Sequence, residues 1–313
     1  KMSDANIVSK HEYKGNLFNT LLASKLKKLL KERKPDLIIG THPFPMIALS
    51  TLKKKYPYRN AFNSFFVPPL ISVLTDYTAH STYIQDEIDY YIAGDEYVKE
   101  VLISEGVDGD KIKPYGIPVE KSFLEHREKS VVLEELGLAP DKFTVLLMGG
   151  SFGAGNIKDT LKELLEIDRD FQIIVITGRN ETLKEKLEKS LEKYTIDKNI
   201  SILGFTQDMN DILSAVDIIV SKPGGLTTTE CLLKELPMII PYYIPGQEEE
   251  NMDFLSNCGA ALRTSKKFTI SVLLKVLIDN PMRMELLKNN IKSVKKQNTA
   301  EDIANLVSNI LGY

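Results

Sequence analysis

The chain has 313 residues, which is enough for two domains with separate hydrophobic cores. Hydrophobic residues make up 43% of it and charged residues 27%, which is typical of a soluble globular protein and excludes a disordered or fibrous one. The net charge of -3 and the lack of any recognised nucleic-acid-binding motif do not favour DNA or RNA as a partner.

Features of membrane-spanning and secreted proteins are not found in the sequence. No apolar run approaches the ~20 residues that a membrane-spanning helix needs, and the first ten residues do not resemble a signal peptide. Cys231 and Cys258 are the only cysteines, and each lies in an apolar segment, which does not favour a disulfide framework or a thiolate zinc site. We therefore expect a cytoplasmic protein.

In the first part of the chain, apolar runs alternate with helical patterns, as in domains with a parallel sheet. The patterns predict a helix over 16–33, a strand with its exit loop over 34–43, strands within 69–77 and 86–94, and a helix over 96–106. Residues 1–60 contain thirteen Lys or Arg and four Asp or Glu, a local charge of +9. Residues 25–34 therefore suit either a solvated helix packed on a sheet or a helix on an anionic membrane surface.

Residues 61–70 form an unusually apolar loop beside this basic region. Phe62, Phe65 and Phe66 either pack into the core of the first domain or, next to the basic run 53–55, enter a membrane surface. Both interpretations remain open on the sequence alone.

A candidate general base follows the strand predicted within 69–77. Asp76 comes directly after an apolar run, where the carboxyl end of a parallel strand faces a ligand site, and His80 lies about one turn later. Alternatively, Asp76 caps a helix and His80 bonds to its own loop. His42 is another histidine at a strand exit, and we expect it to be a satisfied loop residue.

The second part of the chain begins after a hinge with a short helix over 120–142. Strands are predicted near 143–148, 171–176, 199–203, 215–220 and 237–244, with a closing helix over 300–311. The glycine turn at 149–156 does not fit GxGxxG, which disfavours a nicotinamide cofactor. Its helix start suits a diphosphate.

The segment Ser221–Asn251 is the most informative part of the sequence. Pro223, Gly224 and Gly225 end a buried strand, and the apolar spacing after them predicts a helix whose first N–H groups suit a diphosphate. Glu230, one turn further on, suits the two hydroxyls of a ribose. The polar loop 245–251 follows the next strand and suits sugar hydroxyls.

This segment resembles the donor-binding half of glycosyltransferase family 28, especially its diacylglycerol glycosyltransferases, which make glycolipids from UDP-sugars. The resemblance covers roughly residues 30–300. It implies a GT-B fold, α/β with two Rossmann-like doubly wound domains facing a cleft. The donor-binding residues that it implies are Gly150, Ser151, Phe205, Lys222, Gly224, Gly225, Thr227, Thr228, Glu230, Gln247, Glu248 and Asn251. A buried aromatic at a strand end is the other interpretation of Phe205.

The resemblance also implies domain limits and a reaction. We expect an acceptor- and membrane-binding domain over 1–121, with 297–313 packing back on it, and a UDP-sugar-binding domain over 122–296. The implied reaction is inverting transfer of a hexose from UDP-glucose or UDP-galactose to diacylglycerol. Asp76 would be the base, His80 its partner or an acceptor contact, and no metal ion or other cofactor would be needed. The implied location is the inner face of the cell membrane, on an anionic surface.

Two departures from the family pattern affect these expectations. Nothing in residues 1–15 matches the strand and Gly-His loop with which family members usually begin, so we expect the first sheet to lack its opening strand. The chain has no Trp, and Tyr83 stands about where the family often has one. Other functions remain open: an N-acetylglucosaminyl transferase acting on a lipid-linked peptidoglycan precursor, a UDP-N-acetylglucosamine epimerase, or a non-catalytic sugar-nucleotide-binding protein.

Overall fold

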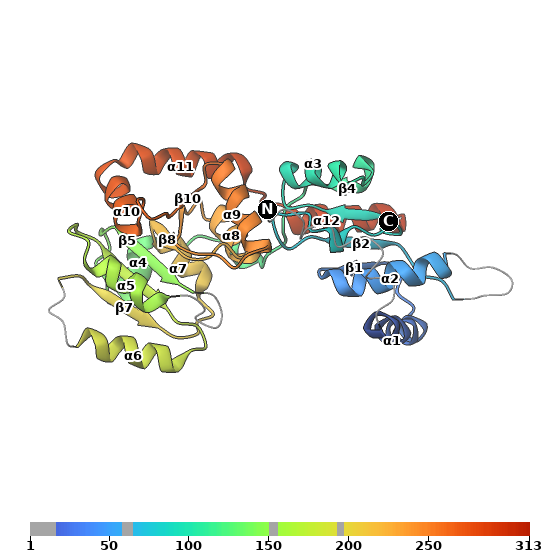
Figure 1. Cartoon of the computed structure of the whole chain (residues 1–313), viewed down its shortest axis with the longest axis horizontal. Helices are drawn as coiled ribbons and strands as arrows, with labels where there is room; N and C mark the ends of the chain where they lie inside the picture. Colours follow the sequence, from blue (N-terminus) through green and yellow to red (C-terminus); the bar gives the residue numbers. More distant parts are fainter. Residues whose placement is uncertain (1–16, 58–64, 150–155, 193–196) are drawn as a thin grey trace, which may run out of the picture. The chain divides into compact units, whose positions relative to one another are not determined.

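The computed structural model describes residues 17–57, 65–149, 156–192 and 197–313. The chain divides into two compact units, Lys1–Ile117 with Asn298–Tyr313 and Pro118–Gln297 (Figure 1). Every strand pair in the described residues is parallel, which confirms the predicted class of two doubly wound α/β domains. None of the described helices is both long and apolar enough to cross a membrane.

The first unit is built on a four-stranded sheet with the order β1-β2-β3-β4. Helix α2 packs on β1 and β2, and α1 packs on α2. Its elements are α1 (Leu17–Arg33), β1 (Ile38–Gly40), α2 (Pro43–Lys55), β2 (Leu70–Val73), η2 (Ser81–Tyr83), β3 (Tyr90–Ile92), α3 (Glu96–Ser104), η3 (Gly109–Lys111), β4 (Ile112–Lys113) and α12 (Thr299–Leu311).

Helix α12 belongs to the first unit although it lies at the far end of the sequence. Ile303 and Leu306, three residues apart on one face of the helix, pack against the β2 residue Ile71. The Thr299 hydroxyl donates a hydrogen bond to the carbonyl of Tyr115 at 2.7 Å. The apolar face of α12 therefore completes the core of the first sheet.

The second unit is built on a six-stranded sheet with the order β10-β9-β8-β5-β6-β7. Helices α5 and α10 pack together, and α7 packs on α8. In the segment before β5, residues 129–135 contact α7 and residues 121–124 contact α8. Its elements are η4 (Lys121–Leu124), α4 (Lys129–Glu135), β5 (Thr144–Met148), α5 (Ile157–Leu165), β6 (Gln172–Ile176), α6 (Glu181–Leu191), β7 (Ile200–Leu203), α7 (Met209–Ala215), β8 (Ile218–Val220), α8 (Gly225–Leu233), β9 (Met238–Ile240), α9 (Gln247–Asn257), β10 (Ala261–Arg263), α10 (Ile270–Asp279) and α11 (Pro281–Val294).

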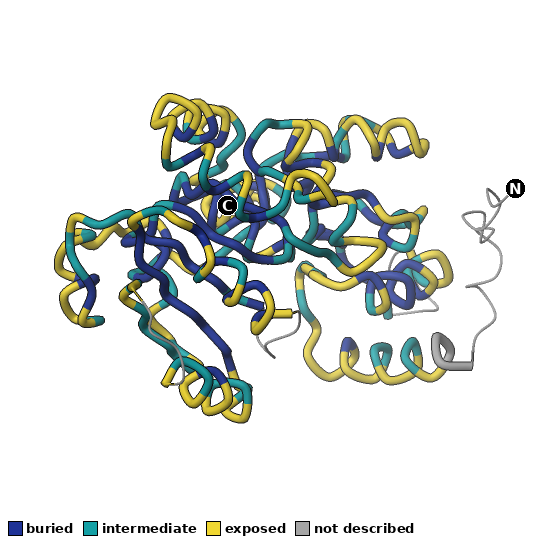
Figure 2. The backbone as a smooth tube through the Cα atoms, turned by 60° about the vertical axis from the view of Figure 1, so that its left-hand side comes forward, coloured by how far each residue is buried: buried dark blue, intermediate teal, exposed yellow. Residues whose placement is uncertain are grey.

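The central strands of the second unit are apolar because both of their faces are covered. Strands β6 and β8 are buried along their whole lengths, and the outward turns of the surrounding helices are exposed (Figure 2). The two polar side chains at the strand starts are paired, since Gln172 Nε2 donates to Thr144 Oγ1 at 2.9 Å. Apolar runs in the sequence therefore correspond to strands between two helical layers.

The strand order of the second sheet reverses between β5 and β8. From β5 the chain proceeds through β6 and β7 toward one edge, and from β8 through β9 and β10 toward the other. Open α/β sheets bind ligands beyond the carboxyl ends of their strands at such a reversal. The turn that leaves β8, Ser221–Gly224, lies at this point.

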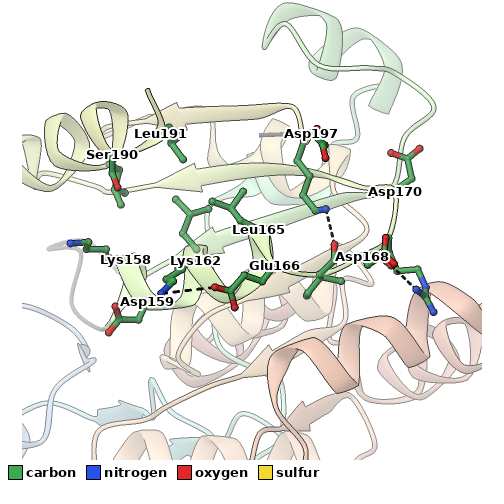
Figure 3. Close-up of a pocket in the computed structure, with 15 residues that line it drawn as sticks. Lys158, Asp159, Lys162, Leu165, Glu166, Asp168, Asp170, Ser190, Leu191 and Asp197 are labelled. Atoms are coloured by element: carbon green, nitrogen blue, oxygen red, sulfur yellow. Dashed lines mark hydrogen bonds and ion pairs between the residues drawn. The ribbon is translucent and has the colours of Figure 1, made fainter. Parts of the chain in front are cut away.

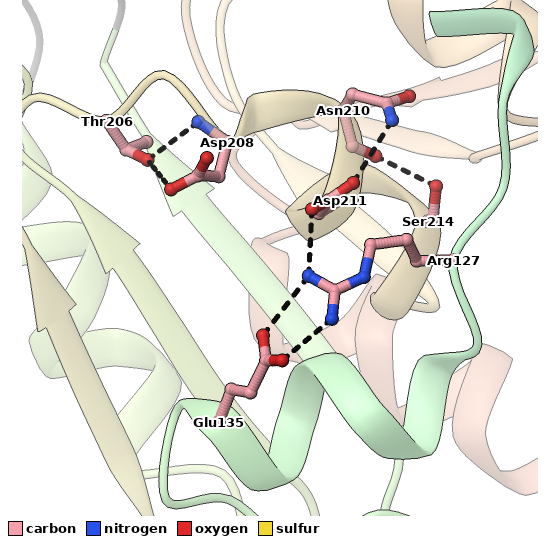
Figure 4. Close-up of polar contacts among 7 residues, drawn as sticks. All are labelled: Arg127, Glu135, Thr206, Asp208, Asn210, Asp211 and Ser214. Atoms are coloured by element: carbon pink, nitrogen blue, oxygen red, sulfur yellow. Dashed lines mark hydrogen bonds and ion pairs between the residues drawn. The ribbon is translucent and has the colours of Figure 1, made fainter. Parts of the chain in front are cut away.

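An arginine fixes the start of the second unit to helix α7 (Figure 4). The Arg127 guanidinium donates to both carboxylate oxygens of Glu135, at 2.7 and 3.1 Å, and to Asp211 at 3.0 Å. These two carboxylates, Glu135 first, raise the pKa of Arg127. Lys129 adds an ion pair to Asp217 at 2.5 Å. The segment before α4 is thus attached to the sheet that carries the β8 turn.

Candidate active site

The turn after β8 presents unpaired backbone N–H groups. Helix α8 begins at Gly225, and its N-cap residue Gly224 provides no side-chain cap. The first bond inside the helix runs from the Thr228 N–H to the Gly224 carbonyl at 2.8 Å, so the N–H groups of residues 225–227 have no partner among the described residues. Such N–H groups, together with the helix dipole, form a site for an anion.

Space is available beside this turn. Gly224 has φ -67° and ψ 145°, a conformation that any residue adopts. A Cβ atom added there would meet no heavy atom of the described chain within 4 Å. Neither strain nor crowding within the protein therefore requires glycine at this position, and the open volume lies beside the unpaired N–H groups.

Three threonines in the first turns of α8 have different surroundings. Thr227 is half-buried. The side chain of Thr228 is fully buried, and its hydroxyl has no hydrogen-bond partner in the described chain. Thr229 Oγ1 donates to the Gly225 carbonyl at 2.9 Å. Of the two threonines predicted to hold the donor, only Thr227 is partly accessible, while Thr228 is an unpaired polar group at the base of the same turn.

The Glu230 carboxyl has a strongly perturbed pKa. Burial, and to a lesser extent the carboxylate of Glu120, raise its pKa to about 7. No cation contributes to this shift, so the described chain leaves the carboxylate without an ion pair. A carboxylate that is held partly desolvated and unpaired is well suited to accept hydrogen bonds from the hydroxyls of a ligand.

The segment predicted as a polar loop after β9 is mostly helical, which corrects the sequence interpretation. Gly246, with φ 105°, is the N-cap of α9, and the exposed Gln247 is its first residue. Glu248 forms an ion pair with Lys222 and accepts a hydrogen bond from the N–H of Ile244 at 2.9 Å. The structure thus brings together two predicted donor-binding residues, Lys222 and Glu248, from successive strand exits.

Asn251 has a different place from the one expected at the sugar. Its side chain is fully buried, and Nδ2 donates to the carbonyl of Pro223 at 3.0 Å. It therefore contacts the glycine turn itself and is not exposed to a ligand in this structure. We assign Asn251 to the positioning of the turn, because its amide joins α9 to the backbone just before Gly224.

A cation and an aromatic ring lie at the other side of the strand reversal. Phe205 is 56% exposed, so it is not the buried aromatic of the alternative interpretation. The Arg179 guanidinium lies over its ring at 5.1 Å from the centroid. These residues follow β6 and β7, and β7 is three strands from β8, a distance of about 14 Å. An extended nucleoside diphosphate has a comparable length.

In the first unit, Asp76 lies at the exit of β2, where the sequence pattern places it. Asp76 is half-buried, and its charge contributes to a raised pKa of Tyr83. Burial is the main cause of that raised pKa, since Tyr83 is only 2% exposed. Its hydroxyl lies 3.4 Å from Thr75 Oγ1. Tyr83 is therefore a core residue that supports the β2 exit and offers no exposed platform in place of tryptophan.

The two strand-exit histidines cap their own turns. His80 Nδ1 accepts from the N–H of Thr82 at 3.3 Å and lies 2.8 Å from its hydroxyl, which is the local alternative weighed from the sequence. His42 Nδ1 accepts from the N–H of Phe44 at 3.4 Å at the start of α2. With Nδ1 as acceptor, the proton of a neutral His80 is on Nε2, and the exposed edge of the ring is a donor.

Comparison with known proteins assigns the chain to a family. Residues 144–307 match the family model described as the glycosyltransferase family 28 C-terminal domain, and residues 3–119 match that of monogalactosyldiacylglycerol (MGDG) synthase. A processive diacylglycerol beta-glucosyltransferase of Bacillus licheniformis is 32% identical over 291 residues, which are 93% of this chain and 73% of the relative.

The chain belongs to glycosyltransferase family 28. Solved structures at lower identity share its fold. Acinetobacter baumannii MurG is 16% identical with a TM-score of 0.68, over 92% of this chain and 77% of that one. UDP-GlcNAc 2-epimerase of Neisseria meningitidis, bound to UDP-GlcNAc, is 18% identical with a TM-score of 0.61, over 93% and 80%. The GT-B fold is thereby confirmed.

Two predicted residues of this family 28 chain are not described by the structure, and two residues beside the candidate site were not predicted. Gly150 and Ser151, predicted near the phosphates or the sugar, lie outside the described residues. Arg179 and Glu120 were missed. The position of Arg179 directly after an apolar strand, on the neighbour of the strand that carries Phe205, was a usable signal. No local pattern indicates Glu120, which acts through proximity to Glu230 in space.

A cavity of about 600 Å³ lies in the second unit (Figure 3). Leu161 and Leu165 of α5 and Leu187 and Leu191 of α6 line it. Lys158 and Asp159 in the first turn of α5 line one part of it, and residues 166–170 and 197–198, which precede β6 and β7, line another. None of the predicted donor-binding residues in the described part of the chain lines the cavity, and we do not assign the donor to it.

Proposed function

We propose that this family 28 chain transfers glucose from UDP-glucose to diacylglycerol with inversion at the anomeric carbon, forming a membrane glycolipid. The name of the Bacillus licheniformis relative supports glucose, diacylglycerol and a β-linked product. Because the sugar of UDP-glucose is α-linked, a β-linked product requires inversion. UDP-galactose, which the sequence interpretation left open, becomes the competing donor in the test.

The single observation that carries the proposal is the start of helix α8. Three unpaired N–H groups lie beside open space at Gly224, at the reversal of the strand order. In the proposed complex they bind the diphosphate, and Glu230 accepts the two ribose hydroxyls. The uracil lies toward Arg179 and Phe205, and the glucose lies toward Gln247 and Glu248.

The proposed reaction needs a base, a stabilised leaving group and a fixed sugar. Asp76 takes the proton of the diacylglycerol hydroxyl as its oxygen attacks the anomeric carbon. The bond from that carbon to the diphosphate breaks, and UDP leaves with the electron pair. The N–H groups of α8 and the ammonium of Lys222 stabilise the departing charge, so the proposal includes no metal ion.

The proposed location is the inner face of the cell membrane, where the chain binds as a peripheral protein. Two observations support it. The second half of helix α1 carries four lysines and an arginine, and two leucines of the helix, Leu21 and Leu29, are 57% and 46% exposed. The aromatic segment beside it is not fully in the core, since Phe65 and Phe66 are half-buried, while Phe62 lies outside the described residues. Basic and apolar groups together bind anionic membrane surfaces.

The proposed role of Glu230 predicts a pH dependence of donor binding. The ionised carboxylate accepts both ribose hydroxyls, and with a pKa of about 7 it is mostly protonated at pH 6 and mostly ionised at pH 8. We expect the affinity for UDP-glucose, whose diphosphate does not titrate in this range, to rise about tenfold over this interval. Isothermal titration calorimetry measures it, and Glu230→Gln should bind weakly with a flat profile.

The same pKa has a consequence for stability that serves as a control. The folded-state pKa lies above the ordinary value of 4.5, so ionisation is unfavourable in the free protein. The wild type should lose stability as pH rises from 4.5 to about 7, and Glu230→Gln should lose less. A pH-independent affinity in the wild type, with this stability difference present, would remove Glu230 from the ribose site.

The decisive experiment for the proposed function offers alternative donors to one preparation. The protein is incubated with radiolabelled UDP-glucose, UDP-galactose or UDP-N-acetylglucosamine and with vesicles that contain diacylglycerol. We expect labelled glucosyl-diacylglycerol from UDP-glucose. Labelled galactolipid would instead identify UDP-galactose as the donor. Isomerisation of the sugar nucleotide without any acceptor would indicate an epimerase, and UDP binding without any product would indicate a non-catalytic protein. Transfer only to a lipid-linked peptidoglycan precursor would replace the acceptor.

A further inference from the structure

Three lysines surround a pair of aromatic rings in the first unit. Tyr56 ends helix α2, and its ring meets that of Phe65 edge-on, with 5.1 Å between centroids. Lys27 Nζ lies 4.0 Å from the Tyr56 centroid and 5.3 Å from that of Phe65. Lys31 Nζ lies 5.8 Å from the Phe65 centroid, and Lys55 Nζ lies 5.7 Å from the Tyr56 centroid. We call these five residues the lysine-aromatic cluster.

The positive charge of the cluster is not neutralised within the described residues. Among the other lysines of these two helices, Lys28 pairs with Glu32, Lys53 with Asp89 and Lys54 with Asp86. Lys27, Lys31 and Lys55, like Lys25, form no ion pair with any described carboxylate. A set of three ammonium groups around one pair of rings, with no counter-charge, is suited to bind an anion.

The hydroxyl of Tyr56 gives the cluster a defined geometry. Lys27 Nζ donates to Tyr56 Oη at 2.6 Å, so the phenol acts as an acceptor and its own proton remains available. This hydrogen bond, followed by the charges of Lys27, Lys55 and Lys31, lowers the pKa of Tyr56. The ammonium groups of Lys27 and Lys55 lie 4.0 and 5.7 Å from the centroid of the Tyr56 ring, and that of Lys31 lies beside the adjoining ring of Phe65. An anion placed beside the Tyr56 hydroxyl is therefore close to more than one lysine.

We propose that the lysine-aromatic cluster binds the phosphate group of an anionic lipid headgroup. The cluster shares no residue with the predicted donor-binding set and does not include Asp76, and the proposal deepens the proposed membrane association, on which it rests. A phosphate offers several acceptor oxygens to the three ammonium groups and the phenol. The half-buried rings of Tyr56 and Phe65 suit the boundary between headgroups and acyl chains, which favours a lipid over a free ion.

The structure also revises which lysines serve this surface. The sequence suggests the whole run Lys53–Lys55 as the basic partner of the aromatic loop. However, Lys53 is 13% exposed and paired with Asp89, and Lys54 is paired with Asp86, so only Lys55 of the run belongs to the cluster. The proposal is therefore a discrete site with a defined membership, and it differs from a general attraction between a basic helix and a negative membrane.

Two matched triple variants test this distinction. The first, Lys27→Gln with Lys31→Gln and Lys55→Gln, removes the cluster charges. The second, Lys25→Gln with Lys28→Gln and Lys54→Gln, removes the same net charge from the same two helices outside the cluster. Cosedimentation measures partition onto phosphatidylcholine vesicles with and without phosphatidylglycerol. We expect the first variant to lose about 100-fold in affinity for phosphatidylglycerol vesicles, and the second to lose less than about tenfold.

Further experiments test whether the phosphate belongs to a lipid or to a soluble molecule, and whether the Tyr56 hydroxyl contributes to binding. Tyr56→Phe keeps every charge, and we expect it to weaken binding to phosphatidylglycerol vesicles several-fold. Soluble glycerol phosphate should displace the wild type from these vesicles only weakly, because it lacks acyl chains. If inorganic phosphate binds tightly to the cluster and vesicle partition is unchanged in the first triple variant, the ligand is a soluble anion and not a lipid. This outcome would overturn the proposal.

The outcomes remain distinct from a failure of the proposed function. Equal losses in both triple variants would overturn the discrete site and leave only diffuse attraction. Thermal unfolding of each variant establishes that the fold is retained. Transfer of glucose to diacylglycerol dispersed in neutral detergent should be unchanged in the first triple variant, because the cluster is outside the catalytic residues. Lack of transfer by the wild type would refute the proposed function, while the vesicle comparison would still decide on the site.

Discussion

Gly224→Ala is expected to weaken the binding of UDP at least about 100-fold while the protein remains folded. The added methyl group meets no atom of the described protein within 4 Å, and the backbone angles at this residue are ordinary for alanine. The methyl would instead occupy the space that the diphosphate needs beside the N–H groups of α8. Isothermal titration calorimetry with UDP measures the loss. Chemical denaturation should show a change in unfolding free energy within about 1 kcal/mol.

A glycine elsewhere in the chain provides the matched control. The Cβ of Gly109→Ala would lie 3.4 Å from Ile103 Cδ1, an ordinary contact, in the first unit. This variant should bind UDP like the wild type. If Gly224→Ala also binds UDP with wild-type affinity, the diphosphate does not lie at the start of α8. The donor site would then have to be sought at another strand exit, since the α8 turn carries the whole assignment.

The strands of both units could be predicted because burial on both faces of a sheet requires a recognisable pattern of apolar residues. Parallel strands covered on both faces need continuous apolar runs, and β6 and β8 are such runs with no exposed residue. The order of the strands could not be read from the same runs. It depends on which strands pair, and the reversal between β5 and β8, which locates the donor site, is a property of pairing alone.

Side-chain roles in the candidate site were harder to predict than its location. Asn251 looks like a sugar ligand in a run of polar residues, but Phe254 and Leu255 follow at three and four positions and are buried with it. This spacing places Asn251 on the inner face of a helix. Three glutamates also begin that helix at its N-terminal turn, where the dipole favours acidic residues. Both signals were present, and the glycine and proline before them favoured a loop instead.

Two pairs of residues in the candidate site interact although they lie far apart in the sequence. Glu120 and Glu230 are 110 positions apart, yet the charge of one contributes to the pKa of the other. Lys222 and Glu248 form an ion pair from different strand exits. Motif spacing along a chain does not report such proximity, which arises only once the sheet has assembled. The chemical state of the site residues therefore required the structure, while their identity came from the motif.

Asp76→Asn is expected to lower kcat for glucosyl transfer by about 1,000-fold and to leave UDP affinity unchanged. Asparagine keeps the shape of the side chain at the β2 exit, but it cannot accept a proton from the acceptor hydroxyl. Because the donor-binding residues belong to the second unit, the substitution should not alter them. Transfer of radiolabelled glucose to diacylglycerol gives kcat, and calorimetry with UDP gives the affinity.

His80→Gln distinguishes a base from a merely local effect at the same strand exit. Its carbonyl oxygen can replace Nδ1 as the acceptor for the Thr82 N–H, so the turn should be retained. Since His80 in this structure caps its own turn, we expect a loss in kcat of less than about tenfold. A larger loss in kcat for His80→Gln than for Asp76→Asn would indicate that His80, and not Asp76, is the general base. Undiminished turnover in both variants would place the base outside this segment, because no other acidic residue follows β2 before η2.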